Sequence, residues 1–108
     1  MLDKNKVIEL SGPEGILIIK EMAYILISLN KIAEHFYHND ECMQSEEQKN
    51  IDYALETTRF IDQNLITTRL AKVRRIISEK FDSTLGGDEM DDIERELELL
   101  KYWERPGD

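Results

Sequence analysis

The chain has 108 residues, of which 41% are hydrophobic and 34% are charged, and it carries a formal net charge of −9. This length predicts a single domain with a small hydrophobic core. The scarcity of Gly and Pro is typical of a helical protein. The strong acidity disfavours nucleic acid as a partner of the whole chain, because the phosphates would repel it.

The single cysteine, Cys42, excludes an internal disulfide and fits a reducing compartment. Residues 1–10 have no signal-peptide core, and the apolar run Ile16–Ile27 is too short to span a bilayer and contains two charges. We therefore expect a cytoplasmic protein that does not enter a membrane.

Residues 1–10 are expected to be a short arm that packs through Val7, Ile8 and Leu10, or frays. The first helix is expected over residues 11–38. Its start is marked by a capping box, in which the side chains of Ser11 and Glu14 each accept a hydrogen bond from the other residue's backbone nitrogen. One face carries apolar residues at helical spacing, and the half from 16 to 27 is apolar on its other sides too, so we expect that half to be the centre of the core.

The second helix is expected over residues 46–63, capped by Ser45, with an apolar stripe of Ile51, Ala54, Leu55, Thr58, Ile61 and Leu65. The phase of the stripe slips by one residue at Leu65. A break near Asn64 and a third helix over 65–82 is preferred to one long helix over 46–82, because very long helices are uncommon in small domains.

A loop ending in Gly86 and Gly87 precedes a fourth helix, expected over residues 88–103 with Asp88 as its cap. The chain thus predicts an all-α fold, a compact antiparallel bundle of about four helices with a short N-terminal arm.

Catalytic and metal-binding patterns are weak. The one grouping of metal-ligand types is Glu34, His35, His38, Asp40, Glu41 and Cys42, and its spacing matches no zinc motif. Residues 82–93 fail as a calcium loop because Ile93 stands where a bidentate Glu is needed. We therefore expect no metal, no cofactor and no enzymatic activity.

The second helix carries the candidate binding site. At about 100° per residue, Tyr53 and Phe60 point away from the apolar stripe, with Glu47, Asp52 and Glu56 on the same helix. Outward aromatic residues among acids are typical of a surface that anchors a basic partner. The alternative is that the arm or another helix covers Phe60.

These features favour a small acidic protein-binding module, most similar in size and charge to inhibitors of basic proteins such as bacterial immunity proteins and antitoxins. One alternative is a self-assembling module in which Tyr53 and Phe60 face a second copy. A less favoured one is a nucleic-acid-linked regulator that uses the basic cluster Arg69, Lys72, Arg74 and Arg75.

Overall fold

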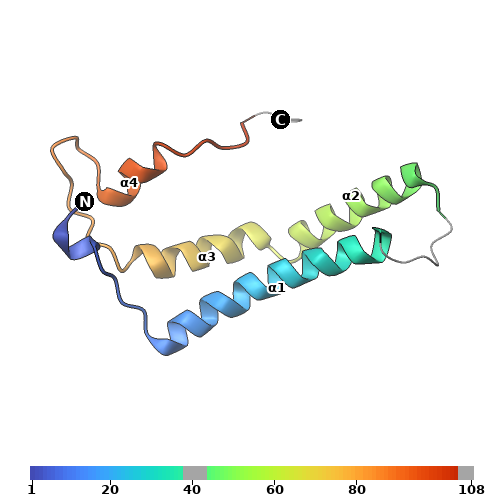
Figure 1. Cartoon of the computed structure of the whole chain (residues 1–108), viewed down its shortest axis with the longest axis horizontal. Helices are drawn as coiled ribbons and strands as arrows, with labels where there is room; N and C mark the ends of the chain where they lie inside the picture. Colours follow the sequence, from blue (N-terminus) through green and yellow to red (C-terminus); the bar gives the residue numbers. More distant parts are fainter. Residues whose placement is uncertain (38–43, 105–108) are drawn as a thin grey trace. The chain divides into compact units, whose positions relative to one another are not determined.

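The computed structural model describes residues 1–37 and 44–104, and these residues form helices and no strands (Figure 1). The elements are a 3-10 helix η1 (Asp3–Asn5) and the α-helices α1 (Gly12–Tyr37), α2 (Glu46–Gln63), α3 (Ile66–Ser78) and α4 (Asp92–Leu97). The all-α fold predicted from the sequence is confirmed. The chain divides into two compact units, one of residues 11–75 and one that joins residues 1–10 to residues 76–108.

Helix α1 begins where the capping box predicts. The Ser11 backbone nitrogen donates to a Glu14 carboxylate oxygen at 3.0 Å, and the Glu14 backbone nitrogen donates to the Ser11 hydroxyl at 3.2 Å. Helix α2 begins with the first half of such a box: the Ser45 hydroxyl accepts from the Gln48 backbone nitrogen at 3.2 Å, while the Gln48 side chain donates to Asp52. Two of the helix starts are thus set by local side-chain chemistry.

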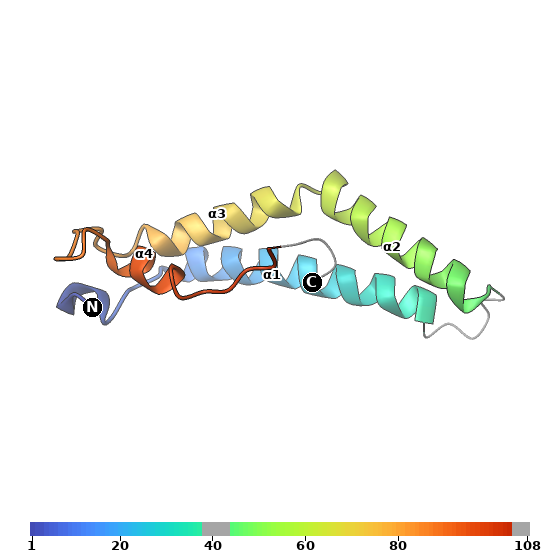
Figure 2. The same ribbon diagram turned by 90° about the horizontal axis from the view of Figure 1, so that it is seen from above.

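Helices α2 and α3 follow one another along α1 and both run antiparallel to it (Figures 1 and 2). They are separated at Asn64 and Leu65, which confirms the break predicted near Asn64. Leu65 has φ 51°, a left-handed conformation that ends α2 and redirects the chain into α3. The prediction of a third helix is correct, although α3 ends at Ser78 rather than at residue 82.

The core of the 11–75 unit lies where α1 meets the end of α2 and the start of α3. Ile25, Phe60 and Ile66 form its buried cluster, with Leu29 and Ile32 packed against it. Ile18 and Val73 are also buried. Of the inner face predicted for α1, Ile18 and Ile25 are buried and Leu29 and Ile32 pack against the core, whereas Met22 is 43% exposed.

The expectation that α1 is buried on most sides between residues 16 and 27 is wrong. Ile16, Ile19, Leu26 and Ile27 each keep more than half of their surface exposed. The unit has only two helical segments, α2 and α3, to cover α1, and both lie on the same side of it (Figure 2). The opposite side of α1 remains exposed.

The predicted apolar stripe of α2 is also placed wrongly, because Leu55 is 64% exposed and Ile51, Ile61 and Leu65 are exposed as well. Helix α2 instead turns Phe60 toward α1. Phe60 buries more surface than a single aliphatic side chain of the stripe would. The turn at Leu65 places Ile66 in the same buried cluster as Phe60.

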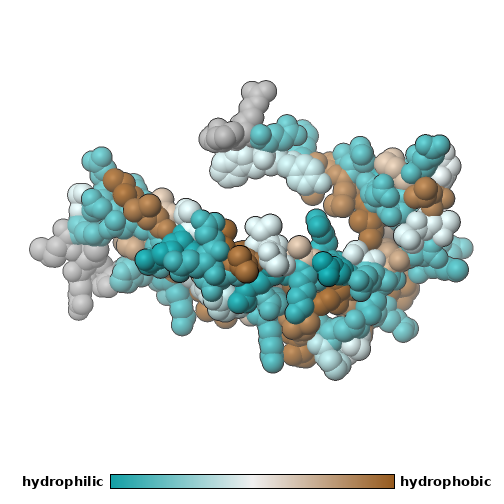
Figure 3. Space-filling model, turned by 180° about the vertical axis from the view of Figure 1, so that it is seen from behind, coloured by the Kyte–Doolittle hydropathy of each residue, from teal (hydrophilic) through white to brown (hydrophobic). Residues whose placement is uncertain are grey.

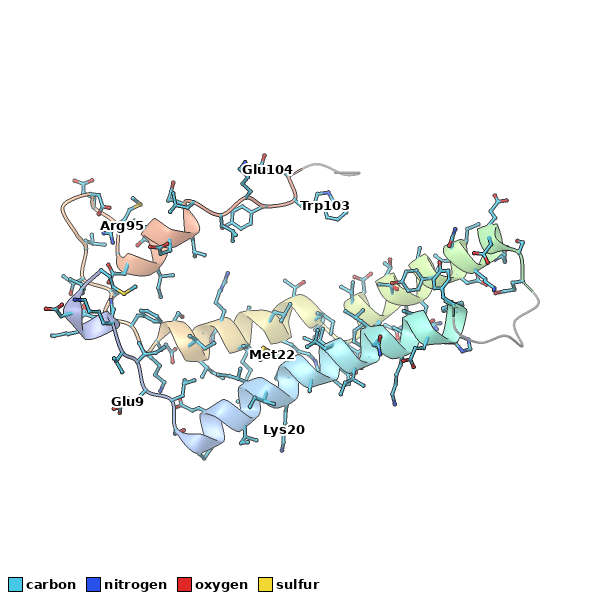
Figure 4. The ribbon with its side chains drawn as sticks, in the orientation of Figure 1. Glu9, Lys20, Met22, Arg95, Trp103 and Glu104 are labelled. Carbon is cyan, nitrogen blue, oxygen red and sulfur yellow. The ribbon has the colours of Figure 1, made fainter. Side chains whose placement is uncertain are left out.

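The second unit is organised around Asn5, whose side chain bonds to Asp82 and Asp92. The expected arm is therefore anchored by a buried amide, whereas Val7 and Leu10 are exposed. Helix α4 is shorter than the predicted span of 88–103, and its cap is Asp91, not Asp88. Asp88 instead accepts hydrogen bonds from Arg95, which is labelled in Figure 4, and from the Met90 backbone nitrogen.

Candidate protein-binding surface

Phe60 does not point outward. It is 9% exposed, it packs with Ile25 and Ile66, and its ring centre lies 5.9 Å from that of Tyr24. The interpretation of Phe60 as a surface anchor is therefore wrong, and the alternative that another helix covers it is correct. Phe60 therefore occupies the space between α1 and the end of α2.

Tyr53 is half-buried against the end of α1. Its ring lies 5.2 Å from the Tyr37 ring and 6.4 Å from the Phe36 ring, both in edge-to-face arrangements. The Tyr37 hydroxyl bonds to Asn50 on α2. This aromatic cluster holds α2 against α1, so Tyr53 supports the position of the helix.

Of the three predicted acids, Glu47 is fully on the surface of α2, whereas Asp52 and Glu56 are half-buried and lie beside Phe36 of α1. Glu47 is exposed in the first turn. Asp52 accepts hydrogen bonds from the side-chain amides of Gln44 and Gln48 at 2.7 and 2.9 Å, and Glu56 pairs with Arg59. Two of these acids are thus held in fixed orientation by neighbours.

The side of α2 turned away from α1 is an exposed apolar strip, which we call the α2 outer stripe: Ile51, Ala54, Leu55, Thr58, Ile61 and Leu65. At about 100° per residue, Asp62 lies between Ile51 and Leu55, and Glu47 lies beside Ala54. Hydrophobic surface is visible along this helix in the space-filling view (Figure 3). An apolar strip with acids inside it is unsuited to a core and suited to a partner with basic groups.

A shallow groove of about 600 Å³ runs along one edge of the α2 outer stripe, where Phe36 of α1 meets α2. Its lining is Phe36, Asp52, Leu55, Glu56, Thr58, Arg59, Asp62 and Gln63. A second hollow shares Phe36 and Glu56 with it. Apolar side chains and the acids Asp52, Glu56 and Asp62 therefore line the same groove, together with Arg59.

The apolar spacing of Ile51 and Leu55 predicts a stripe that packs inward, so the sequence pattern does not reveal them as surface residues. The signal that could have found them is Asp62, because a carboxylate in the middle of an apolar stripe opposes burial of that stripe. The arc that carries Tyr53 and Phe60 also carries Thr57 and Asn64 and has an acid only at the helix start, Glu46. That arc is the one compatible with a core.

The basic cluster of α3 is partly engaged inside the unit. The Arg69 guanidinium lies 4.5 Å from the centre of the Tyr24 ring, pairs with Glu21 at 3.3 Å and donates to the Asn64 carbonyl at 3.0 Å. The Tyr24 hydroxyl in turn donates to the Asn64 side chain at 2.9 Å. Arg69 therefore stabilises the turn between α2 and α3, whereas Lys72, Arg74 and Arg75 are exposed.

A second charged cluster lies in the other unit. Asp92 is 5% exposed, and the Asn5 hydrogen bond, with further bonds from the Leu2 backbone and Arg95, lowers the pKa of Asp92 to about 2. Arg95 also holds the pKa of Asp88 well below its usual range. Every one of these groups is paired with another group of the same unit, so the cluster is a structural lock and offers no open ligand position.

Metal ligands do not gather within residues 1–37 and 44–104. Of the grouping singled out in the sequence, Glu34 and His35 are exposed, and His35 stacks edge-on against Phe36 with ring centres 4.8 Å apart. His38, Asp40, Glu41 and Cys42 lie outside the described residues. Among the described helices, none combines the length and apolar composition needed to cross a bilayer.

The chain was also compared with known proteins. Searches against protein-family models, curated proteins and solved structures gave no significant match.

Proposed function

We propose that this chain is a protein-binding module that neutralises a basic protein, in the manner of an inhibitor, an immunity protein or an antitoxin. The observation that carries the proposal is the α2 outer stripe, an exposed apolar strip that is bordered by acids on a chain of net charge −9. The module acts by occupying a surface of its partner and carries out no chemistry. It works in the cytoplasm, which its single cysteine permits.

In this proposal Ile51 and Leu55 provide the buried centre of the interface. Side chains that are exposed in the free protein and become desolvated on binding supply most of the affinity. Tyr53 and Phe60 serve the same interface indirectly, since they fix α2 against α1 and so present the stripe on a rigid helix.

Glu47, Asp52, Glu56 and Asp62 provide the charged part. They lie around the apolar strip and along the groove, where lysine and arginine side chains of a basic partner can reach them. Charges placed in this way speed encounter and select the partner more than they raise affinity. The association is therefore expected to weaken as salt rises.

The test is an affinity capture that compares matched baits. Wild-type protein, an Ile51→Ser and Leu55→Ser variant, and a Glu47→Lys and Glu56→Lys variant are each used on extract from the native cells at low and high salt. The control bait carries Glu96→Lys and Glu98→Lys, the same change of charge on exposed residues of the other unit. Any protein retained is then purified and its binding measured by calorimetry.

The proposal expects one basic protein that is retained by the wild type and the control, released by salt, and lost from both α2 variants. Measured with purified partner, either α2 variant should bind at least about ten-fold more weakly than the control. Equal retention by all four baits would overturn the assignment of this surface. Retention of acidic or nucleic-acid-bound proteins alone would overturn the basic partner.

A further inference from the structure

The side of α1 turned away from α2 and α3 is a second exposed apolar surface, which lies apart from the α2 outer stripe. We call it the α1 outer face; it comprises Ile16, Ile19, Ala23, Leu26, Ile27 and Asn30. Leu26 is 68% exposed, and Lys20, on the same side of the helix, extends away from α3 (Figure 4). Met22, by contrast, lies toward α3 in the same view.

We propose that the α1 outer face is the interface between two copies of this chain. The proposal goes beyond the proposed function and does not rest on it, since it concerns a different surface and a different partner. The two copies would use the same face of α1, so the contact is isologous and closes as a dimer.

The spacing of the face fits a helix-to-helix seam. Ile16, Ile19, Ala23, Leu26 and Asn30 follow one another at intervals of three, four, three and four residues, which is the spacing of alternating seam positions in a coiled coil. The small Ala23 at the middle of this series lets two helices approach closely. Asn30, at the polar end, occupies a position where a single Asn fixes the register of paired helices.

The area of the face fits a dimer as well. Four aliphatic residues exposed by more than half, with Ala23, make an apolar patch on the order of 500 Å², which is the upper part of the range for monomeric proteins. Two such patches in contact remove about 1,000 Å² from water, the lower limit for a specific interface. A dimer of moderate affinity is the consequence.

The charges select a second copy over a basic partner. A chain of net charge −9 repels its own copies wherever acids face one another. Between Ile16 and Asn30 the only acid of α1 is Glu21, which pairs with Arg69 on the inner side, and Lys20 adds a positive charge beside the face. The α1 outer face is therefore a surface through which two acidic copies can meet, and it lacks the acids that would attract a basic protein.

The test is the mass of the full chain in solution, measured by sedimentation equilibrium up to about 1 mM protein. Ile19→Glu combined with Leu26→Glu places two acids in the seam. The matched control, Ile51→Glu with Leu55→Glu, makes the same changes on the α2 outer stripe. Circular dichroism shows whether each variant keeps its helices, which is expected because all four residues are exposed.

We expect a monomer–dimer equilibrium for the wild type and the control, and a monomer for the α1 variant at every concentration. Asn30→Ile gives a second, opposite readout, since an apolar residue at this seam position should strengthen the dimer by at least about ten-fold. A monomeric wild type would overturn the proposal. Loss of the dimer in the control alone would assign self-association to α2 instead.

Discussion

Asn5 and Asp92, which are 87 positions apart in the chain, share a buried hydrogen bond of 2.7 Å between the amide nitrogen of Asn5 and a carboxylate oxygen of Asp92. The same Asn5 side chain donates to the Asp82 carbonyl at 3.0 Å and accepts from the Asp82 backbone nitrogen at 2.7 Å. One amide thus joins three segments of the unit. Asn5 is only 4% exposed, so water cannot replace these bonds.

Replacing Asn5 with Ala should therefore loosen the whole unit rather than one residue. The Asp82 backbone and the Asp92 carboxylate lose partners while they remain shielded from water, which is the costly way to break a hydrogen bond. We expect the Asp82 amide to exchange with solvent at least about ten-fold faster in native-state hydrogen exchange. Lys6→Ala is the control, because the Lys6 side chain is exposed and forms an ion pair with Asp3 on the surface. Equal exchange rates in both variants would contradict the role given to Asn5.

The hydrogen-bonded cluster of Asn5 and Asp92 should also lose stability in acid. The Asn5 hydrogen bond, followed by those of Leu2 and Arg95, lowers the pKa of Asp92 from 3.8 to about 2. A lowered pKa in the folded state adds stability that is complete well above 3.8, decreases as the pH falls through that value, and is gone below about 2. Nuclear magnetic resonance of the Leu2 amide and the Asn5 side-chain amide should follow this loss. Asp92→Asn should reduce the pH response of these two amides, because Asp82 and Asp88 of the same unit keep their own lowered pKa values, and an unchanged response would assign it to those groups.

The burial of Phe60 gives a direct comparison with the α2 outer stripe. Phe60→Ala should lower the free energy of unfolding by about 3–4 kcal/mol, because it empties the contact between Ile25 and Ile66. Leu55→Ala, on the exposed side of the same helix, should change it by less than about 1 kcal/mol. Urea unfolding followed by circular dichroism measures both. A larger loss for Leu55→Ala would return the outer stripe to the core.

Leu65 holds a conformation that costs a branched side chain free energy. Its φ of 51° lies in the left-handed region, and its exposed side chain has few contacts to offset the cost. Leu65→Gly should therefore raise the free energy of unfolding by about 1 kcal/mol. Thr67→Gly, two residues later in the first turn of α3, should instead lower it by a few tenths of a kcal/mol, because glycine is a somewhat weaker helix former than threonine. If both glycines destabilise the protein equally, the turn carries no relievable strain.

The sequence was sufficient for what local chemistry decides. Ser11 and Ser45 predicted the starts of α1 and α2, because a capping side chain needs only its neighbours three residues on. The phase slip at Leu65 predicted the break before α3. The inner face of α1 followed from its helical spacing.

What the sequence left open depends on distant contacts. The spacing of α2 allows either of two faces to be buried. The face with Phe60 is the buried one, because the turn at Leu65 brings Ile66 into the cluster that Phe60 forms with Ile25. The candidate surface therefore includes the predicted acids Glu47, Asp52 and Glu56. Its apolar residues are Ile51 and Leu55 in place of Tyr53 and Phe60. The role of Asn5 could not be predicted for the same reason, because its partner Asp92 is far from it in the chain.

The division of the chain has a consequence for the order in which the protein is made. Residues 11–75 form a unit that is contiguous in the chain, whereas the bond of Asn5 can form only after Asp92 has been synthesised. At 5–20 residues per second the wait lasts roughly 4 to 17 s. During that interval the Asn5 side chain lacks its Asp92 partner, and the later synthesis of the segment that begins α4 supplies it.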